Sequence, residues 1–336
     1  MMRALVTLVL ALYTQNIFPK FVPIDHLPPT WELVAQYSKR SVIKYDVPGS
    51  GRCTGTIISN SGHVLTAMHC FQDCLKSNGS FSVSKISNDS GFDYYARIKQ
   101  EKLPTCNIRY KDYNFKEGDD LNSDLELTQA KIVATGAGKI LLNPTDPEID
   151  SIFDFHKRNT SLFSKLREKG IGRLIGDFVI FQSNAFKSKS CSKVSNERLK
   201  DNQLLSISFP NYTYSRNEGV NPNGRSQYMS LGSISRNGVL SSDSSFLNIL
   251  KSNFKSNEIE KAYNFKNEII WSDVDLVSGS SGSPLINKSG EIYALSTFNI
   301  CDAYRAKREG CRYSSGGITI SSIKKNISED FFNCDR

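Results

Sequence analysis

Short runs of β-forming residues, separated by turn residues, dominate this chain and limit the folds open to it. The clearest hairpin signal is the pair of apolar runs 56–58 and 63–66, which flank the turn Asn60-Ser61-Gly62. Many short strands with few helices are typical of a β-sandwich or a β-barrel. The sequence therefore predicts an all-β protein, with further strands at residues 94–99, 127–134, 178–182, 204–209, 285–286, 291–298 and 317–320.

Only two stretches have the spacing of a helix. Residues 146–168 carry apolar side chains at helical intervals, and residues 321–331 place Ile323 and Ile327 on one face. Of the 336 residues, 39% are hydrophobic and 23% are charged, so the chain can form a core, which excludes disorder and a coiled coil as its main state. The formal net charge of +8 is scattered along the chain and does not indicate a nucleic-acid partner.

The N-terminus has the form of an export signal. Arg3 precedes residues 4–13, a run of ten residues with one polar member, which is too short to span a bilayer because a span takes about 20 residues. We predict a signal peptide at residues 1–19, cleaved between residues 13 and 20; the alternative is a buried N-terminal strand. The eight cysteines contain no CxxC pair, which favours disulfides. We expect a secreted or periplasmic/extracellular protein without stable membrane insertion.

The run 279–284 (GSSGSP) is the strongest chemical signal. A serine between glycines, followed by proline and a strand, is typical of a tight turn that exposes one hydroxyl group. The backbone N–H groups of Gly279 and Ser281 could then point at one spot and bind a developing oxyanion. On its own, such a run is also compatible with an ordinary serine- and glycine-rich turn.

A base for that hydroxyl is found among only four histidines. An alcohol is a poor nucleophile at neutral pH, and histidine is the usual base that activates it. His69 ends the run Thr66-Ala67-Met68-His69-Cys70, directly after a predicted strand, whereas His26, His63 and His156 have no comparable surroundings. His69 is therefore the candidate base.

Together, Thr-Ala-x-His-Cys and Gly-x-Ser-Gly-Ser-Pro resemble the motifs of the chymotrypsin/trypsin-like serine endopeptidases. The resemblance implies His69 as general base, Ser281 as nucleophile, and Gly279 with Ser281 as the oxyanion hole. It also implies a disulfide between Cys53 and Cys70. No metal and no organic cofactor is expected in such a site.

The same resemblance implies a fold of two six-stranded antiparallel β-barrels with the site in the cleft between them. We expect the N-terminal barrel at residues 41–188, with a helical insertion at about 143–172. The C-terminal barrel and a short terminal helix are expected at residues 189–330. The remaining disulfides are expected to be Cys301–Cys311, Cys74–Cys106 and Cys191–Cys334.

Two aspartates compete for the role of orienting the His69 imidazole. Asp177 immediately precedes four apolar residues, as the family's aspartate precedes a strand, whereas Asp124 lies in a run of alternating charged and apolar residues. The run 204–210 resembles the Gly-Tyr-Pro strand of the bacterial glutamyl-endopeptidase branch, and it begins 204 − 177 = 27 residues after Asp177. This interval favours Asp177, and Asp124 remains the alternative.

The substrate pocket is weakly encoded. Asp275 lies where trypsin-like enzymes carry the acid that selects Lys or Arg, but Asp273 matches an aspartate of the bacterial branch instead. Ser296, Thr297 and Phe298 resemble the strand that lines the pocket wall. Ser280 stands where trypsin-like zymogens carry the aspartate that pairs with a new N-terminus, so activation by that route is not expected.

These features predict a secreted serine endopeptidase that acts on proteins or peptides through His69, Asp177 and Ser281. Two alternatives remain at this point. One is a protein of the same fold that binds a partner with little or no catalysis, and the other is an esterase that uses the same triad. The oligomeric state is not predicted.

Overall fold

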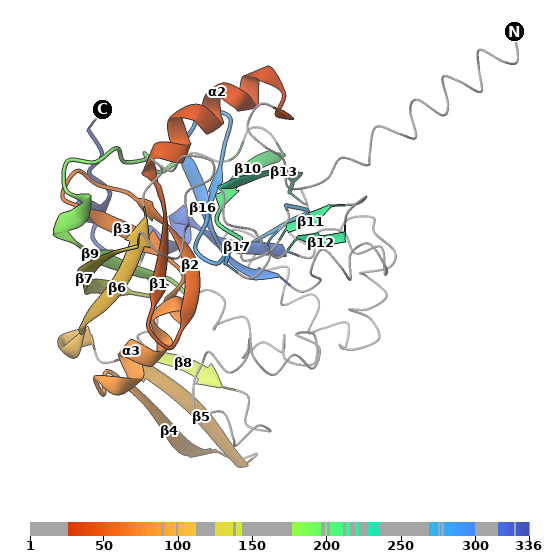
Figure 1. Cartoon of the computed structure of the whole chain (residues 1–336). Helices are drawn as coiled ribbons and strands as arrows, with labels where there is room; N and C mark the ends of the chain where they lie inside the picture. The colour runs from red at the N-terminus through yellow and green to blue at the C-terminus, as the bar shows by residue number, and fades with distance from the viewer. Residues whose placement is uncertain are drawn as a thin grey trace, which may run out of the picture.

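In the computed structural model, the described residues form many strands and few helices (Figure 1). The described residues of the 336-residue chain are 26–88, 91–98, 100–111, 125–136, 139–142, 177–195, 199, 202–210, 213–215, 219–221, 227–234, 269–274, 276, 279–299, 315–325 and 327–335. Within these ranges the predicted all-β class is confirmed. The expected signal peptide and the expected helical insertion lie outside the described residues.

Six antiparallel strands between residues 42 and 182 form a closed barrel in the order β1-β2-β3-β9-β7-β6. The expected hairpin is present, with Thr56 opposite Leu65 and Gly62 in the turn at φ 81°. Tyr45, Phe71 and Phe181 pack together inside the barrel. The strands are β1 Val42–Val47, β2 Gly51–Ile57, β3 His63–Thr66, β6 Thr105–Lys111, β7 Glu126–Thr135 and β9 Val179–Gln182.

The second half forms a six-stranded antiparallel sheet in the order β13-β10-β15-β16-β17-β14. Its two edge strands approach each other, because Ile234 after β13 pairs with Ser272 of β14. Gly317 of β17 allows close approach to β16, since a Cβ there would overlap the Leu295 carbonyl group. The strands are β10 Gln203–Ser208, β13 Tyr228–Ser233, β14 Ile269–Ser272, β15 Pro284–Ile286, β16 Ile292–Asn299 and β17 Ser315–Thr319.

Smaller elements surround these two groups of strands. The expected helix at residues 321–331 is two short helices, α10 Ile320–Lys324 and a 3₁₀ helix Glu329–Phe332, because Ser328 caps the second one separately. None of the helices in the described ranges is long and apolar enough to cross a bilayer. The other elements are α3 Gln72–Ser77, a sheet of β4 Phe81–Asn88, β5 Gly91–Ile98 and β8 Lys139–Leu142, and a pair β11 Thr213–Ser215 and β12 Gly219–Asn221.

Helices α2 and α3 were not predicted, and α2 is the longer of the two. Helix α2 (Pro29–Ser38) begins with proline in its first turn, and it lies over the second sheet (Figure 1). Trp31 and Ala35 on its inner face pack with Leu205, Ile207 and Met229 of that sheet. The helix has only ten residues, which is too short to be stable in isolation, so it depends on this tertiary packing.

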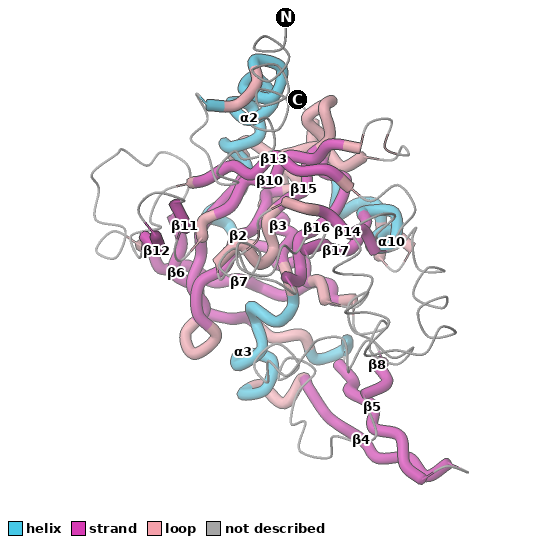
Figure 2. The backbone as a smooth tube through the Cα atoms, turned by 90° about the vertical axis from the view of Figure 1, so that its right-hand side faces the viewer, coloured by secondary structure: helices cyan, strands magenta, loops and turns pink. Residues whose placement is uncertain are grey.

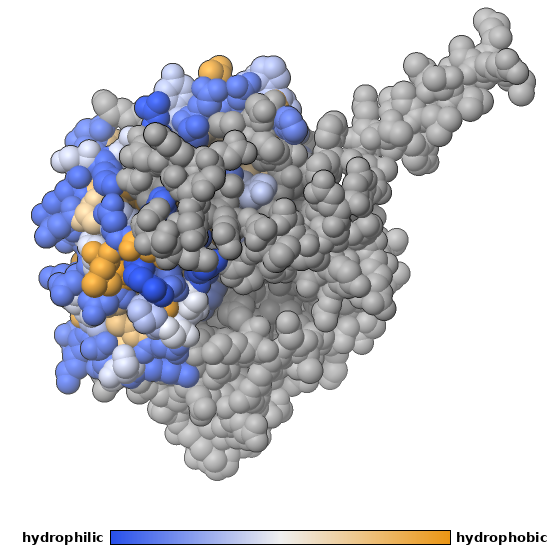
Figure 3. Space-filling model, in the orientation of Figure 1, coloured by the Kyte–Doolittle hydropathy of each residue, from blue (hydrophilic) through white to orange (hydrophobic). Residues whose placement is uncertain are grey.

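An apolar cluster joins the barrel to the second sheet. Leu65 and Phe178 of the barrel side pack with Leu295 and Ile318 of the sheet, and all four are buried. In Figure 2, β3 is seen near β16 and β17, the strands that carry Leu295 and Ile318 of this cluster. The described surface seen in Figure 3 is mostly hydrophilic. The segment before β15 comes close to the segment after β3, since a Cβ on Gly282 would lie 2.9 Å from the Ala67 nitrogen.

Candidate active site

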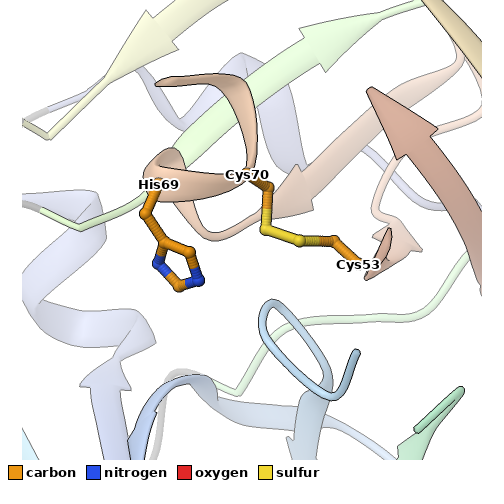
Figure 4. Close-up of side chains that lie close together, drawn as sticks. All are labelled: Cys53, His69 and Cys70. Atoms are coloured by element: carbon orange, nitrogen blue, oxygen red, sulfur yellow. A yellow bond between two sulfur atoms is a disulfide. The ribbon is translucent and has the colours of Figure 1, made fainter. Parts of the chain in front are cut away.

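His69 is held at the end of β3 by a short helix and a disulfide. It lies in the 3₁₀ helix Met68–Phe71, next to Cys70, which is bonded to Cys53 of β2 (Figure 4). One ring nitrogen of His69 and the two sulfur atoms all lie within 4.8 Å of one another. Because the sulfurs are bonded to each other, they do not offer thiolate ligands to a metal ion.

The carboxylate of Asp177 contacts His69 at two points. Asp177 lies two residues before β9, 108 residues along the chain from His69. The His69 backbone N–H donates to Asp177 Oδ1 at 3.0 Å, and His69 Nδ1 lies 2.8 Å from Asp177 Oδ2. The Asp177 side chain is 6% exposed and the His69 side chain 18% exposed. The acid is therefore shielded while part of the imidazole stays accessible.

This contact selects one tautomer of the imidazole. An ionised carboxylate offers only acceptors, so the hydrogen bond places the ring proton on Nδ1. In a neutral ring the other nitrogen, Nε2, is then free of its proton and can accept one. The arrangement can support general-base chemistry at Nε2.

The run 279–284 forms the expected turn directly before β15. Gly279 and Gly282 have φ values of 92° and 83°, in the left-handed region that favours glycine. Between them, the Ser280 carbonyl accepts a hydrogen bond of 3.0 Å from the Ser283 N–H. Ser281 is partly exposed, whereas Ser280 and Ser283 are buried. The turn thus brings one serine toward the surface.

Thr54 of β2 connects this turn to the barrel. Its N–H donates to the Ser281 carbonyl at 2.9 Å, and its hydroxyl donates to the Gly279 carbonyl at 2.8 Å. Thr54 follows Cys53, whose disulfide partner Cys70 follows His69. A chain of hydrogen bonds and one covalent bridge therefore links the serine turn to the histidine.

Two further buried hydroxyl groups, of Thr66 and Tyr45, form a hydrogen-bonded series with Thr54. Thr66 Oγ1 donates to the Thr54 carbonyl at 2.8 Å, and the Tyr45 hydroxyl lies 2.7 Å from Thr66 Oγ1. Burial raises the pKa of Tyr45; the hydrogen bond with Thr66 opposes this, and the charge of Asp177 adds to it. The Tyr45 hydroxyl therefore stays protonated and serves as a donor.

Ser280 has a neutral partner. Its hydroxyl donates to Ser208 Oγ at 3.2 Å, and both side chains are buried. An ion pair of the trypsin-zymogen kind needs a carboxylate at this position, which a hydroxyl cannot replace.

The expected pocket residues are described only in part. Ser296 and Thr297 of β16 are buried, and the Ser296 backbone pairs with the serine turn through Gly282 N–H and the Ser283 carbonyl. Phe298 pairs with Gly316 across the sheet. Asp275, the predicted specificity residue, and Asp124, the alternative acid, lie outside the described residues.

Disulfides other than Cys53–Cys70 also follow the expected pairing. Cys74 is bonded to Cys106, and Cys191 is bonded to Cys334. Cys301 and Cys311 lie outside the described residues.

Sequence reasoning missed the hydroxyl groups of Tyr45, Thr54 and Thr66. Thr66 is the first residue of the histidine motif and Thr54 directly follows Cys53, but nothing in the local sequence states which carbonyl group each hydroxyl reaches. Their partners lie up to 225 residues away, and only the fold brings them together.

Comparisons with known proteins agree with the motifs. The family model described as "Peptidase S7, Flavivirus NS3 serine protease" matches residues 221–299, which include the serine turn. No curated protein sequence matches the chain.

Several solved structures of low similarity are proteases. One is a serine endoprotease from Yersinia pestis, with 12% identity, a TM-score of 0.41, and coverage of 91% of this chain and 68% of that one. Another is a Glu endopeptidase, with 12% identity, a TM-score of 0.39, and coverage of 85% and 88%. Because these scores are below 0.5, the fold assignment depends on the two groups of strands described above. In its serine-turn motif, which the family model matches, and in its strand arrangement, the chain resembles the chymotrypsin-like serine proteases.

Proposed function

We propose that this protein is a secreted serine endopeptidase. The observation that carries the proposal is the two-point contact of Asp177 with His69, in the same barrel whose strand β2 is hydrogen-bonded to the Ser281 turn through Thr54. Asp177, rather than Asp124, is the proposed acid. The family model over residues 221–299 supports protease chemistry at the turn.

In the proposed reaction Ser281 Oγ attacks the scissile carbonyl carbon while His69 Nε2 accepts the hydroxyl proton. Asp177 keeps the ring proton on Nδ1 and stabilises the imidazolium that forms. The N–H groups of Gly279 and Ser281 bind the oxyanion. His69 then protonates the leaving amine, and water, deprotonated by His69, hydrolyses the acyl-enzyme.

Export and substrate recognition are further parts of this proposal. The disulfides among the described residues support an oxidising compartment, and residues 1–19 are the proposed signal peptide. Protein or peptide substrates are expected to contact β16 at Ser296, Thr297 and Phe298, with Asp275 as a candidate selector of Lys or Arg. The domain ranges 41–188 and 189–330 remain predictions.

A fluorophosphonate probe tests the nucleophile. We expect the wild-type protein and Ser289→Ala to be labelled and Ser281→Ala to be unlabelled, because Ser289 is an exposed serine in another turn. Casein hydrolysis should fall by roughly 10⁴-fold or more in Ser281→Ala.

Two outcomes would contradict the proposal in different ways. A wild-type protein that neither reacts with the probe nor cleaves casein would indicate a binding protein of this fold. Ser281-dependent labelling with turnover of p-nitrophenyl esters but no cleavage of casein or a peptide library would indicate an esterase.

A further inference from the structure

We propose that Thr54, in strand β2 of the barrel, is a positioning residue that sets the geometry of the oxyanion hole. The inference rests on the proposed function, because it concerns the same Ser281 turn. In this proposal the buried Thr54 hydroxyl group holds the peptide plane between Gly279 and Ser280 in one orientation.

Three successive peptide planes around Ser281 are each held by hydrogen bonds. The plane between Ser281 and Gly282 is held at both ends, by Thr54 N–H on the carbonyl and by the Ser296 carbonyl on the amide. The plane between Ser280 and Ser281 is held by Ser283 N–H. Backbone groups make all of the bonds on these two planes, so no side-chain substitution removes them directly.

The plane between Gly279 and Ser280 differs, because the group that holds it among the described residues is a side chain. Thr54 Oγ1 donates to the Gly279 carbonyl at 2.8 Å. Gly279 has φ 92° and no side chain, so its own conformational preferences restrain this plane weakly. The proposed oxyanion donors belong to the neighbouring peptide groups. The N–H of Gly279 precedes this plane along the chain, and the N–H of Ser281 follows it. A rotation of the plane would change the direction of both donors.

The Thr54 hydroxyl is itself oriented. It accepts a hydrogen bond of 3.0 Å from the Phe209 N–H, which directly follows β10 of the second sheet. A hydroxyl group has one hydrogen to donate. Because a lone pair of Thr54 Oγ1 accepts from the Phe209 N–H, the hydroxyl hydrogen of Thr54 points to the Gly279 carbonyl. Thr54 is fully buried, so water does not compete for these bonds.

Thr56 offers a matched control on the same strand. It lies two residues further along β2, on the same face, and is buried to 1% exposure. Within the described part of the chain its Oγ1 makes no hydrogen bond. A change of Thr56 to valine therefore removes the same group from the same strand without touching the serine turn.

The experiment compares the wild-type protein, Thr54→Val, Thr54→Ser and Thr56→Val at a temperature well below each unfolding midpoint. The readouts are kcat and KM for p-nitrophenyl acetate and the second-order rate constant of fluorophosphonate labelling. We expect Thr54→Val to lower kcat and the labelling rate roughly ten- to hundredfold, less than the loss of a whole oxyanion donor. KM and the pH midpoint of kcat/KM should stay unchanged, because substrate binding and the His69 base are untouched.

The two control variants should behave as the hydroxyl contacts require. Thr54→Ser keeps the hydroxyl and should retain most of the wild-type kcat, and Thr56→Val should match the wild type. If Thr54→Val does not fold, Thr54→Ser and Thr54→Ala provide the same comparison, since both lack the methyl group and differ only in the hydroxyl.

Several results would overturn the inference. Equal kcat in folded Thr54→Val and the wild type would do so, as would Thr54→Ser as slow as Thr54→Val, or an equal loss in Thr56→Val. In each of these cases Ser281-dependent labelling of the wild type would leave the proposed function intact. A wild type that the probe does not label would instead remove the proposed function and this inference with it.

Discussion

At the scale of single residues, the serine turn depends on glycine at a place where another chain segment comes very close. A Cβ on Gly282 would overlap the Thr54 carbonyl oxygen and Thr66 Oγ1, and it would lie 2.9 Å from the Ala67 nitrogen. Gly282 also has φ 83°. Both the backbone angle and the contact with the barrel therefore exclude a side chain.

The first prediction concerns this glycine. We expect Gly282→Ala to lower the free energy of unfolding by roughly 2–4 kcal/mol, because it combines a left-handed backbone with overlap against rigid backbone. Gly51→Ala is the control, since Gly51 has φ 88° with nothing within 4 Å of an added Cβ. Urea unfolding followed by circular dichroism measures both, and an equal loss in the two variants would contradict the close approach.

A second prediction at this scale concerns His63. Burial lowers its pKa, and Ser59 Oγ, which accepts from the His63 backbone N–H, lies 2.8 Å from its Nδ1. The unfolded chain therefore binds the His63 proton more readily than the folded chain does. This contribution to stability is complete above the ordinary histidine pKa and is lost as the pH falls below it.

Urea midpoints at pH 7.5, 6.5 and 5.5 test this direction. We expect the wild type to lose stability over this range more steeply than His63→Gln, which has no titrating group at the position. Parallel profiles for the two proteins would mean that other groups carry the pH dependence.

At the scale of elements, α2 shows how tertiary packing stabilises a helix that its own sequence signals weakly. Its inner residues Trp31 and Ala35 are buried against the second sheet, whereas Leu33 and Tyr37 are exposed. The inner face of the helix is therefore part of the folded core.

The prediction for this element compares its two faces. Trp31→Ala should lower the free energy of unfolding by about 3–5 kcal/mol, because it removes a large, fully packed side chain. Tyr37→Ala should change it by less than about 0.5 kcal/mol, because Tyr37 is 67% exposed. Denaturant unfolding of the two variants decides this, and similar losses would mean that α2 does not dock as described.

At the scale of the whole molecule, three kinds of connection hold the barrel and the second sheet together. They are the shared apolar cluster, the hydrogen bonds of Thr54 to the serine turn, and the segment after β9. Ser192 N–H donates to the Ile57 carbonyl of the barrel, and Ser195 N–H donates to the Ile292 carbonyl of the sheet. Cys191 at the start of this segment is bonded to Cys334 near the C-terminus.

The prediction at this scale concerns that disulfide. Replacing Cys191 and Cys334 by serine should lower the free energy of unfolding by about 2–4 kcal/mol, because the bridge closes a long loop of the unfolded chain. Its sequence separation is 143, against 32 for Cys74–Cys106, so the matching double variant of the shorter loop should lose less. Thermal and urea unfolding measure both, and a larger loss for the shorter loop would contradict this reasoning.

Local patterns predicted what depends on neighbours in the sequence. The β2–β3 hairpin follows from two apolar runs around a turn with Gly62, and the serine turn follows from glycines that adopt left-handed angles. The same patterns failed where an element depends on distant partners. Helix α2 was missed because the surface that buries Trp31 comes from residues more than 170 positions later. The terminal helix was extended too far, since the Ser328 cap was not recognised as a new start.

By itself, the sequence determined the all-β class and the two short motifs around His69 and Ser281, because turn chemistry and strand alternation act over a few residues. Only the tertiary structure decided which buried carboxylate meets the imidazole and which hydroxyl reaches the serine turn. Those contacts join Asp177 to His69 over 108 residues and Thr54 to Gly279 over 225. They depend on strand register and on a core shared between two sheets, and no local run of residues specifies either of these.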